Sequence, residues 1–423
     1  MDFDELRRIQ GEQARNRVLY EQIFNEKARL SSRAMSVEKQ TTLRVLGEEL
    51  KPGSCVLDLG CGAGVYALPL AEAGHSVLAI DPVPRHIEEM RQEIKPGMKL
   101  ETCIGDALGI LSELPENLFD AVLCLGPMYH LHTREDRLRC LKEVARVLKP
   151  GGRIFLAFIN SDWVIATMTL RYDGGDYLLN GDYDKDSFRC EDFPFQFHTL
   201  AEAEAELEEA GLYPRRRMTS DGLNEMHQTL IDGFTETQFS QWLRYHEYLC
   251  EKPEFLGCGN HLLFVCVKEN PGYIRSLRGR VGKRPLMQCG ASVIVENASG
   301  EVLLLRRADT GDWCYPGGAV ELYEQTEAAA RRELLEETGL TAGKLILFGV
   351  FSGPQNAFIY PNGDRVSNVD IVYVCHDFEG ELQAEEGEAS ELRFFKKDSL
   401  PEDLFPPTAQ VLRDYIEKSV KHE

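Results

Sequence analysis

The sequence predicts two domains in tandem, an α/β domain with a parallel sheet followed by an α+β domain. Its 423 residues are enough for two or three separate cores. From about residue 36 to 160, short β-branched runs alternate with amphipathic helical patterns, as in a parallel sheet with crossover helices. The run 269–284 combines Pro, Gly and basic residues as a linker does, so we expect domains at 1–268 and 285–423.

The first domain is expected to contain five parallel strands and a later strand that closes it. Thr133 with Asp136 begins a helix that Pro150-Gly151-Gly152 stops, and Thr199 with Glu202 begins another. Between these helices, residues 161–198 are aromatic and rich in Gly and Asp without a clean period, which predicts an insertion that covers a pocket. The expected strands are 55–59, 76–80, 100–104, 121–125, 153–159 and 261–267.

Charge and composition argue against several classes of function. The formal net charge is −22, from 69 acidic and 47 basic residues, so small molecules are expected as partners rather than nucleic acid or anionic lipid. The twelve cysteines form no CxxC pair, which predicts free thiols rather than zinc ligands or disulfides. The charged start MDFDELRRIQ and the lack of a long apolar run predict a cytoplasmic protein without a membrane segment.

The second domain is predicted to open with a hairpin followed by a long helix. Strands are expected at 288–296 and 301–306, with a turn at 297–300 between them. The helix is rich in Ala and Leu, with Thr326 as its expected N-cap and Gly339 as the left-handed residue that ends it. Strands grouped around one long helix are typical of an α+β domain.

Three glutamates on this helix are the candidate metal ligands. Glu333, Glu336 and Glu337 stand at positions i, i+3 and i+4, so they share one face. Like charges at these spacings destabilise an isolated helix, which indicates a bound hard cation such as Mg²⁺ or Mn²⁺. For the three glutamates alone, a solvated charged face is the competing interpretation.

The spacing around these glutamates extends into a longer motif. It consists of Gly318, five residues, Glu324, seven residues, Arg332-Glu333-Leu334, one residue, Glu336-Glu337, one residue and Gly339-Leu340. This pattern resembles the signature of the Nudix hydrolases over a domain of about 140 residues. The resemblance implies an α/β/α sandwich in which Glu333, Glu336 and Glu337 are catalytic and bind the metal, and the hydrolysis of a nucleoside diphosphate derivative. It also implies structural roles for Gly318, Glu324, Arg332 and Gly339.

The signature identifies neither the base that activates water nor the group that recognises the substrate. Candidates for the base lie in one acidic run, for which a surface loop is the alternative interpretation: Glu385, Glu386, Glu388 and Glu391. Phe351, Phe358 and Tyr360 are candidates to stack on a nucleobase, with core packing as the alternative.

A glycine-rich turn follows the first strand of the first domain. Residues 60–64 read Gly-Cys-Gly-Ala-Gly after Asp58, and such a turn lets a ligand approach the backbone at the carboxyl edge of parallel strands. A dinucleotide-binding fingerprint would need glycine at position 65, where the chain has Val65. Asp81 ends the second strand and Asp106 follows the third, so both are expected at the same edge.

This arrangement resembles the S-adenosylmethionine-binding motifs of the class I methyltransferases, in order over about 270 residues. It implies a Rossmann-like fold with S-adenosylmethionine as the cofactor, bound by Asp58, Gly60, Cys61, Gly62, Gly64, Asp81 and Asp106. Tyr129 and His130 are candidates to face a small-molecule methyl acceptor, and a structural hydrogen bond is the alternative for His130. Tyr20 is a further candidate contact of the cofactor.

The sequence leaves three functions to distinguish. A bifunctional enzyme would both transfer methyl groups and hydrolyse a nucleoside diphosphate derivative. Alternatively, one half only binds or senses its ligand, for instance a methyltransferase fold that holds its cofactor without transferring methyl. Modification of nucleic acid is the third function, and the acidic composition argues against it.

Overall fold

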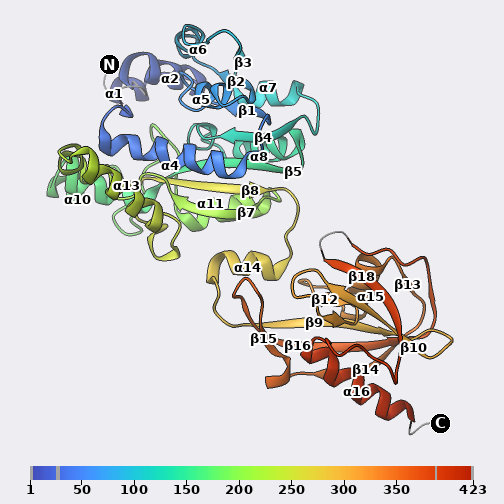
Figure 1. The fold of residues 1–423 in the computed structure, drawn as a ribbon. Helices are drawn as coiled ribbons and strands as arrows, with labels where there is room; N and C mark the ends of the chain where they lie inside the picture. Colours follow the sequence, from blue (N-terminus) through green and yellow to red (C-terminus); the bar gives the residue numbers. More distant parts are fainter. Residues whose placement is uncertain (1–2, 25–28, 386–387, 421–423) are drawn as a thin grey trace. The chain divides into compact units, whose positions relative to one another are not determined.

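The computed structural model describes residues 3–24, 29–385 and 388–420 of the chain. It divides into two compact units, the first ending at Pro271 and the second beginning at Gly272 (Figure 1). The segment predicted as a linker contains α14 (Tyr273–Val281), which belongs to the second unit. The Tyr273 N–H donates to Glu321 at 2.8 Å, and both residues lie in this unit. The structure therefore places a helix of the second unit within the segment predicted as a linker.

The first unit is built on one sheet with the strand order β3-β2-β1-β4-β5-β8-β7. Strands β1 to β5 are parallel, β8 is antiparallel to both of its neighbours, and the short β6 pairs with the end of β5. The bounds are β1 (Cys55–Leu59), β2 (Ser76–Asp81), β3 (Lys99–Ile104), β4 (Phe119–Cys124), β5 (Leu148–Asn160), β6 (Phe197–His198), β7 (Tyr213–Thr219) and β8 (His261–Val267).

Strand β5 differs most from its predicted extent. It begins at Leu148, which pairs with Phe119 of β4, rather than at residue 153. The Pro150-Gly151-Gly152 sequence, expected only to stop the preceding helix, therefore lies inside the strand. Strand β7 was not predicted at all, because its sequence YPRRRMT carries three arginines and lacks an apolar alternation.

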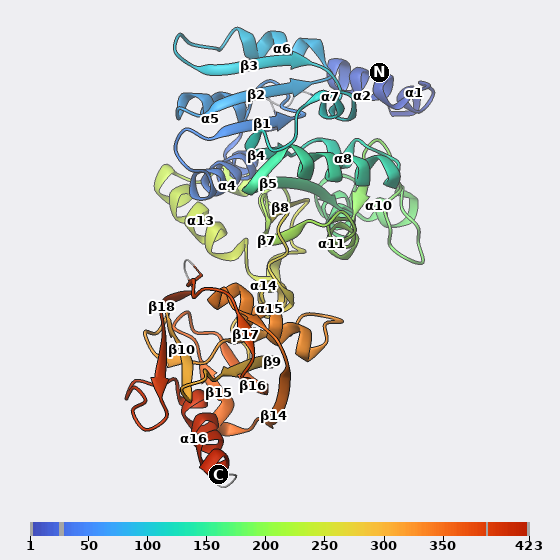
Figure 2. The same cartoon turned by 90° about the vertical axis from the view of Figure 1, so that its right-hand side faces the viewer.

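Helices cover both faces of this sheet because its strands are apolar on both. In β1, Leu57 packs into one cluster of buried residues and Val56 into another. Figure 2 shows α7, α8 and α11 on one side of the sheet and α4, α5 and α13 on the other. The bounds are α4 (Arg33–Glu49), α5 (Ala67–Glu72), α6 (Pro84–Arg91), α7 (Ala107–Glu113), α8 (Arg134–Val147), α11 (Leu200–Glu209), α12 (Gln228–Asp232) and α13 (Glu236–Leu249). Among the described helices, none is both long and apolar enough to cross a bilayer.

Two segments outside the sheet reach the loop that follows β4. The amino-terminal leader contains α1 (Phe3–Arg7), α2 (Glu12–Val18) and η1 (Leu19–Ile23), and the insertion contains α9 (Ser161–Thr167), η3 (Met168–Tyr172) and α10 (Gly175–Asn180). From the insertion, the Gln196 N–H donates to the Tyr129 carbonyl at 2.9 Å, and the Phe195 ring lies 5.5 Å from that of His130. The insertion thus lies next to both residues that were expected to face an acceptor.

The second unit places helices on both sides of its strands. Along β9, Val293 packs against the face of α15 that carries Leu334, whereas Ile294 packs towards Val411 of α16. The strands form sheets of order β12-β9-β16-β14, with β15 also on β16, then β11-β10-β18 and β13-β17. The bounds are β9 (Leu286–Val295), β10 (Glu301–Arg307), β11 (Trp313–Cys314), β12 (Gly317–Ala319), α15 (Thr326–Thr338), β13 (Thr341–Ala342), β14 (Leu345–Phe351), β15 (Ala357–Ile359), β16 (Arg365–Cys375), β17 (Phe378–Glu379), β18 (Ala389–Lys396) and α16 (Pro406–Val420).

Helix α15 ends as predicted but begins differently. Gly339 follows it in the left-handed conformation, with φ of 75°. The N-cap is Gln325, whose side chain makes no capping hydrogen bond, and not the predicted Thr326. The Thr326 hydroxyl pairs instead with the Tyr373 hydroxyl at 2.8 Å. The Thr326 hydroxyl therefore makes a tertiary hydrogen bond instead of the backbone capping bond that the local pattern predicted.

Candidate active sites

The Gly60–Gly64 turn follows β1 and is held against the end of β2. The N–H groups of Gly60 and Cys61 donate to the Ile80 carbonyl at 2.8 and 3.0 Å. Gly60, Gly62 and Gly64 have φ values of 70°, 53° and 86°, which other residues rarely adopt. A Cβ on Gly64 would also lie 2.8 Å from the Met90 side chain. At Gly64 both the backbone conformation and the packing require glycine.

Asp81 fixes this turn through its side chain. Its Oδ2 accepts from the Gly62 N–H at 2.9 Å. Its Oδ1 accepts from the Val83 N–H at 2.9 Å and from His86 Nδ1 at 3.1 Å. The carboxylate is thus oriented from two sides while it lines the neighbouring cavity.

Asp58 supplies a buried oxygen without a partner. Its side chain lines the cavity, and Oδ2 makes no hydrogen bond to the described residues. Burial, with the negative charge of Asp81, raises the pKa of Asp58 to about 7. An unsatisfied buried acceptor is costly, so this position fits a ligand that brings a positive charge or a donor.

A cavity of about 270 Å³ brings most of the predicted cofactor residues together. Gly64 does not line it, because this residue lies behind the turn against Met90. Asp106 lines the cavity and also caps α7, accepting from the Gly109 N–H at 2.9 Å. The predicted residues that line it are Asp58, Gly60, Cys61, Gly62, Asp81, Asp106, Tyr129, His130 and Tyr20.

Tyr20 and His130 meet at the wall of the same cavity. The Tyr20 hydroxyl and His130 Nε2 share a hydrogen bond of 2.8 Å. Arg85 donates to the Tyr20 carbonyl at 2.8 Å and so ties the leader to α6. Burial lowers the pKa of His130 to about 3, so its imidazole is neutral at physiological pH. His130 Nδ1 makes no hydrogen bond to the described residues, which leaves one ring nitrogen for a ligand.

Sequence reasoning missed three charged residues that also line the cavity. Arg29, Glu38 and His261 line it, and none belongs to a recognisable motif. They precede α4, lie on α4 and begin β8, respectively. Segments so far apart in the chain carry no common spacing, so only the fold could reveal them.

In the second unit, Arg332 braces the loop before α15. Its Nε and Nη2 donate to the two oxygens of Glu324 at 2.9 and 3.0 Å. Nη2 also donates to the Ala319 carbonyl at 3.1 Å, and Glu324 accepts from the Glu321 N–H at 2.9 Å. A two-pronged guanidinium–carboxylate pair fixes direction as well as distance, so the loop is held rigidly against the helix.

The three candidate metal ligands differ in their surroundings. Arg332 Nη1 donates to Glu333 at 2.7 Å and to Glu336 at 3.0 Å. Glu337 is buried and accepts from the Gly317 N–H at 2.8 Å. Burial, followed by the charges of Glu333 and Glu388, raises the pKa of Glu337 to about 8. A Cβ on Gly318 would collide with the Glu333 carboxylate, so glycine there leaves room for the acid.

The negative charge of Glu333, Glu336 and Glu337 suits a cation, but the three carboxylates do not converge on one position. Within the described residues, no three Asp, Glu, His or Cys side chains are grouped closely enough to hold a metal ion. Arg332 pairs with Glu333 and Glu336, whereas Glu337 forms no ion pair with any residue that the structure describes. Glu337 is therefore the carboxylate that would gain most from a bound divalent cation.

The candidate bases and aromatic residues take up different positions. Glu388 lies close enough to raise the pKa of both Glu333 and Glu337, while Glu391 pairs with Arg393 on the exposed side of β18. Glu385 has a raised pKa because of burial and the charges of Glu388 and Glu336. Glu386 lies outside the described residues.

The three aromatic candidates pack against other rings. Phe351 stacks on Phe348 at 5.8 Å within a hydrophobic cluster. Phe358 lies 4.9 Å from Tyr360 and 5.0 Å from Phe405. These contacts agree with core packing, the alternative interpretation of all three residues. Their stacking on a nucleobase stays a prediction.

Comparisons with known proteins agree with the two-unit fold. Residues 56–152 match the family model of a methyltransferase domain, and residues 287–415 match that of the NUDIX domain. The chain is 34% identical over 128 residues to a ubiquinone biosynthesis O-methyltransferase of Xylella fastidiosa, which covers 30% of this chain and 50% of that protein. It is 33% identical over 132 residues to a probable tRNA methyltransferase 9B of Mus musculus, covering 31% and 27%. The chain spans about half the length, or less, of these curated relatives.

Solved structures resemble each unit separately. A MutT NUDIX hydrolase from Burkholderia pseudomallei is 30% identical, with a TM-score of 0.27, and the match covers 30% of this chain and 97% of that one. A SAM-dependent methyltransferase from Methanosarcina mazei is 21% identical, with a TM-score of 0.36, and the match covers 53% and 98%.

Together, the fold and the family matches define a chain with two enzyme domains. The first unit contains a methyltransferase domain on a Rossmann-like sheet, and the second contains a NUDIX domain. The predicted fold class and both predicted resemblances are confirmed.

Proposed function

We propose that this chain is a bifunctional cytoplasmic enzyme. Its first unit transfers a methyl group from S-adenosylmethionine to a small-molecule acceptor. Its second unit hydrolyses a nucleoside diphosphate derivative with Mg²⁺ or Mn²⁺. The observation that carries the proposal is that both sites keep their motif residues in ordered positions, around the cavity in one unit and on the braced helix α15 in the other. The twelve free thiols support a reducing location.

In the first unit, the cavity suits a cationic methyl donor. S-adenosylmethionine would supply an electrophilic methyl group on a positively charged sulfur. Asp58 and Asp81 give the cavity wall negative charge, and the glycine turn leaves space beside the backbone. Methyl transfer depends mainly on aligning the nucleophile, the methyl carbon and the leaving sulfur. Tyr129 and His130 lie where they can hold an acceptor for this alignment.

In the second unit, α15 presents its acids to a divalent cation. Glu333, Glu336 and Glu337 would hold the ion, which would neutralise charge on the diphosphate and polarise water. Glu324 and Arg332 keep the preceding loop in place. Glu388 is our candidate for the base that takes a proton from the attacking water, because its charge acts on both Glu333 and Glu337.

Two measurements on the full chain test this proposal. Calorimetry with S-adenosylhomocysteine should show binding to the first unit. A screen of nucleotide sugars, dinucleotides and oxidised nucleoside triphosphates with Mg²⁺, coupled to phosphate release, should show hydrolysis. Glu337→Gln should abolish most hydrolysis and leave S-adenosylhomocysteine binding unchanged. Absence of both activities from the wild-type chain would refute the bifunctional assignment.

The alternatives give different results in the same assays. A sensing module would bind S-adenosylhomocysteine tightly without transferring methyl to any component of a cell extract. The tRNA methyltransferase among the relatives motivates the nucleic-acid alternative. In that case RNA would bind with an affinity that falls steeply as salt increases.

A further inference from the structure

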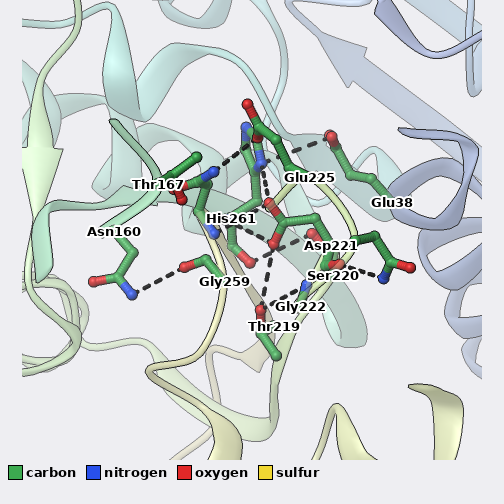
Figure 3. Close-up of polar contacts among 12 residues, drawn as sticks. Glu38, Asn160, Thr167, Thr219, Ser220, Asp221, Gly222, Glu225, Gly259 and His261 are labelled. Atoms are coloured by element: carbon green, nitrogen blue, oxygen red, sulfur yellow. Dashed lines mark hydrogen bonds and ion pairs between the residues drawn. The ribbon is translucent and has the colours of Figure 1, made fainter. Parts of the chain in front are cut away.

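Four charged residues form a cluster where β7 and β8 reach the proposed methyl-transfer cavity: Arg29, Glu38, Asp221 and His261. Figure 3 shows His261 in contact with both Asp221 and Glu38. Arg29, Glu38 and His261 line the cavity, and Asp221 holds His261 from outside it. We call these residues the Asp221–His261 cluster.

The topology places this cluster in the half of the cavity that the donor does not need. The glycine turn, Asp81 and Asp106 follow β1, β2 and β3, on one side of the strand order. Strand β7 ends just before Asp221, and the antiparallel β8 begins at His261, so both residues reach the same sheet edge on the other side. In α/β sheets, ligands bind across this edge where the strand order reverses. A donor over β1–β3 therefore leaves the β5–β8–β7 half for the acceptor.

The two carboxylates of the cluster are already satisfied within the chain. Asp221 accepts from the N–H groups of Asn260 and His261 and from His261 Nδ1, each at 3.1 Å. Glu38 accepts two hydrogen bonds from Arg29, at 2.7 and 3.2 Å. Neither carboxylate is therefore free to bind a cationic acceptor without losing a partner.

His261 is the group that remains available. Burial opposes its charge, but Glu38 and Asp221 outweigh burial and raise the pKa of His261 to about 9. The ring is thus an imidazolium with two donors at neutral pH. Nδ1 donates to Asp221, and Nε2 makes no hydrogen bond to the part of the chain that the structure describes. One charged donor on the cavity wall is left for a ligand.

We propose that His261 binds an anionic oxygen of the methyl acceptor through Nε2, and that Asp221 positions the His261 ring. This inference rests on the proposed methyl transfer. The acceptor is then a carboxylate, or an acidic hydroxyl that loses its proton to solvent before binding. A lone pair of this oxygen forms the bond to the methyl carbon while the carbon–sulfur bond breaks and its electrons stay on sulfur. The charges of the oxyanion and the sulfonium cancel, so the step requires no base.

The first experiment separates this inference from donor binding. Full-length wild type, His261→Gln, Asp221→Asn and the control His227→Gln are titrated with S-adenosylhomocysteine. His227 is exposed and lies outside the cavity. All four proteins should bind it with dissociation constants within about threefold, which also shows that the variants are folded. No binding by the wild type would contradict the proposed methyl transfer and not only the role of His261.

The second experiment identifies the charge of the acceptor. Methyl-labelled S-adenosylmethionine is incubated with each protein and with cell-extract fractions retained by an anion exchanger, retained by a cation exchanger, or unretained. Label should enter the anionic fraction, with about a 100-fold lower rate for His261→Gln and no change for His227→Gln. Base-labile label indicates a carboxylate acceptor, and base-stable label indicates a hydroxyl. Label from the other fractions alone, or full activity of His261→Gln, would overturn the proposal. If the wild type binds S-adenosylhomocysteine but labels nothing, the proposed transfer itself fails.

A pH profile tests the positioning role of Asp221. The charged groups that face His261 are Asp221 after β7, Glu38 on α4 and Arg29 before α4. Asp221→Asn removes one of the two charges that raise the His261 pKa, so the imidazolium is lost at a lower pH. The upper pH limit of methyl transfer, near 9 in the wild type, should therefore fall. An Asp221→Asn enzyme that is less stable but keeps the wild-type pH limit would show a merely structural role.

Discussion

Buried glutamates behave in opposite ways in the two units. Glu38 lies next to Arg29 and His261, and although burial opposes its charge, these cations lower its pKa to about 2. Glu337 forms no ion pair with the described residues, and burial together with the charges of Glu333 and Glu388 raises its pKa to about 8. The same side chain is thus held charged in one unit and pushed towards neutrality in the other.

This difference separates two uses of a buried acid. In the first unit the chain supplies its own counter-charges, so the acid orients other side chains. In the second unit no described cation pairs with Glu337, so a divalent cation would supply the counter-charge that its ionised form lacks. Variants of Glu38 should therefore change stability, and variants of Glu337 should change hydrolysis.

The largest effect is expected at Glu337. Glu337→Gln should lower Mg²⁺-dependent hydrolysis by about 1000-fold, since it removes a proposed metal ligand. It should not destabilise the second unit, because a buried acid with a raised pKa costs stability at neutral pH. Glu327→Gln, an exposed acid on the same helix, is the matched control and should retain full activity. Hydrolysis by Glu337→Gln within threefold of the wild type would remove the contrast between the units.

Next in size is the pH-dependent stability of the first unit. The lowered pKa of Glu38 contributes about 3 kcal/mol, which is fully present above pH 4.5 and lost as the pH falls towards 2. The raised pKa of His261 contributes stability that is fully present below pH 6.5 and is lost as the pH rises through about 9. Urea unfolding should therefore show Glu38→Gln to be most destabilising between pH 4.5 and 6.5, and nearly neutral at pH 2.

The control for Glu38 lies on the same helix. Glu48 is half-exposed and pairs with Arg44 and Arg216, so Glu48→Gln should cost at most about 1 kcal/mol. Equal losses for both variants across the pH range would mean that burial does not strengthen the Glu38 pairing.

A smaller effect is expected at the glycine turn. Gly64→Ala should cost about 2 kcal/mol and weaken S-adenosylhomocysteine binding, because a Cβ there is both strained and in collision with Met90. Gly53 also has a positive φ, of 77°, but nothing lies within 4 Å of its added Cβ. Gly53→Ala should therefore cost about 1 kcal/mol and leave binding intact. Calorimetry and thermal unfolding of the two variants isolate the contribution of packing.

The smallest effect compares two neighbouring arginines on α15. Arg332→Ala should destabilise the second unit by about 1–2 kcal/mol, since it leaves Glu324 and Glu333 without their partner. Arg331 makes one exposed pair with Glu327 and donates to the Ala342 carbonyl at 2.6 Å, so Arg331→Ala should cost less, at most about 1 kcal/mol. Unfolding measurements that rank the two variants in the reverse order would disprove the bracing role.

The predictable parts of the sites are those that one short segment encodes. Glu333, Glu336 and Glu337 lie on one helix, and Gly60–Gly64 lie in one turn, so spacing alone sets their relative positions. The order of strands and helices in the first unit follows from the same local periodicity.

What could not be predicted depends on contacts between distant segments. His261 was correctly placed at the start of a strand, but nothing local indicates that β8 inserts antiparallel between β5 and β7. That insertion is what brings His261 to Asp221 and Glu38. The same holds for Thr326, which pairs with Tyr373, and for α14, whose first N–H donates to Glu321. Both partners are distant in the sequence.

Only part of the first unit matches the methyltransferase family model. The segment that matches the methyltransferase family model ends at residue 152, before β7 and β8 begin. That segment contains the glycine turn, Asp81 and Asp106, whereas Asp221 and His261 lie outside it. If His261 binds the acceptor as proposed, substitutions within residues 219–261 would change the acceptor without altering the turn at Gly60–Gly64. A domain built in this way can change what it modifies while it keeps the source of the methyl group.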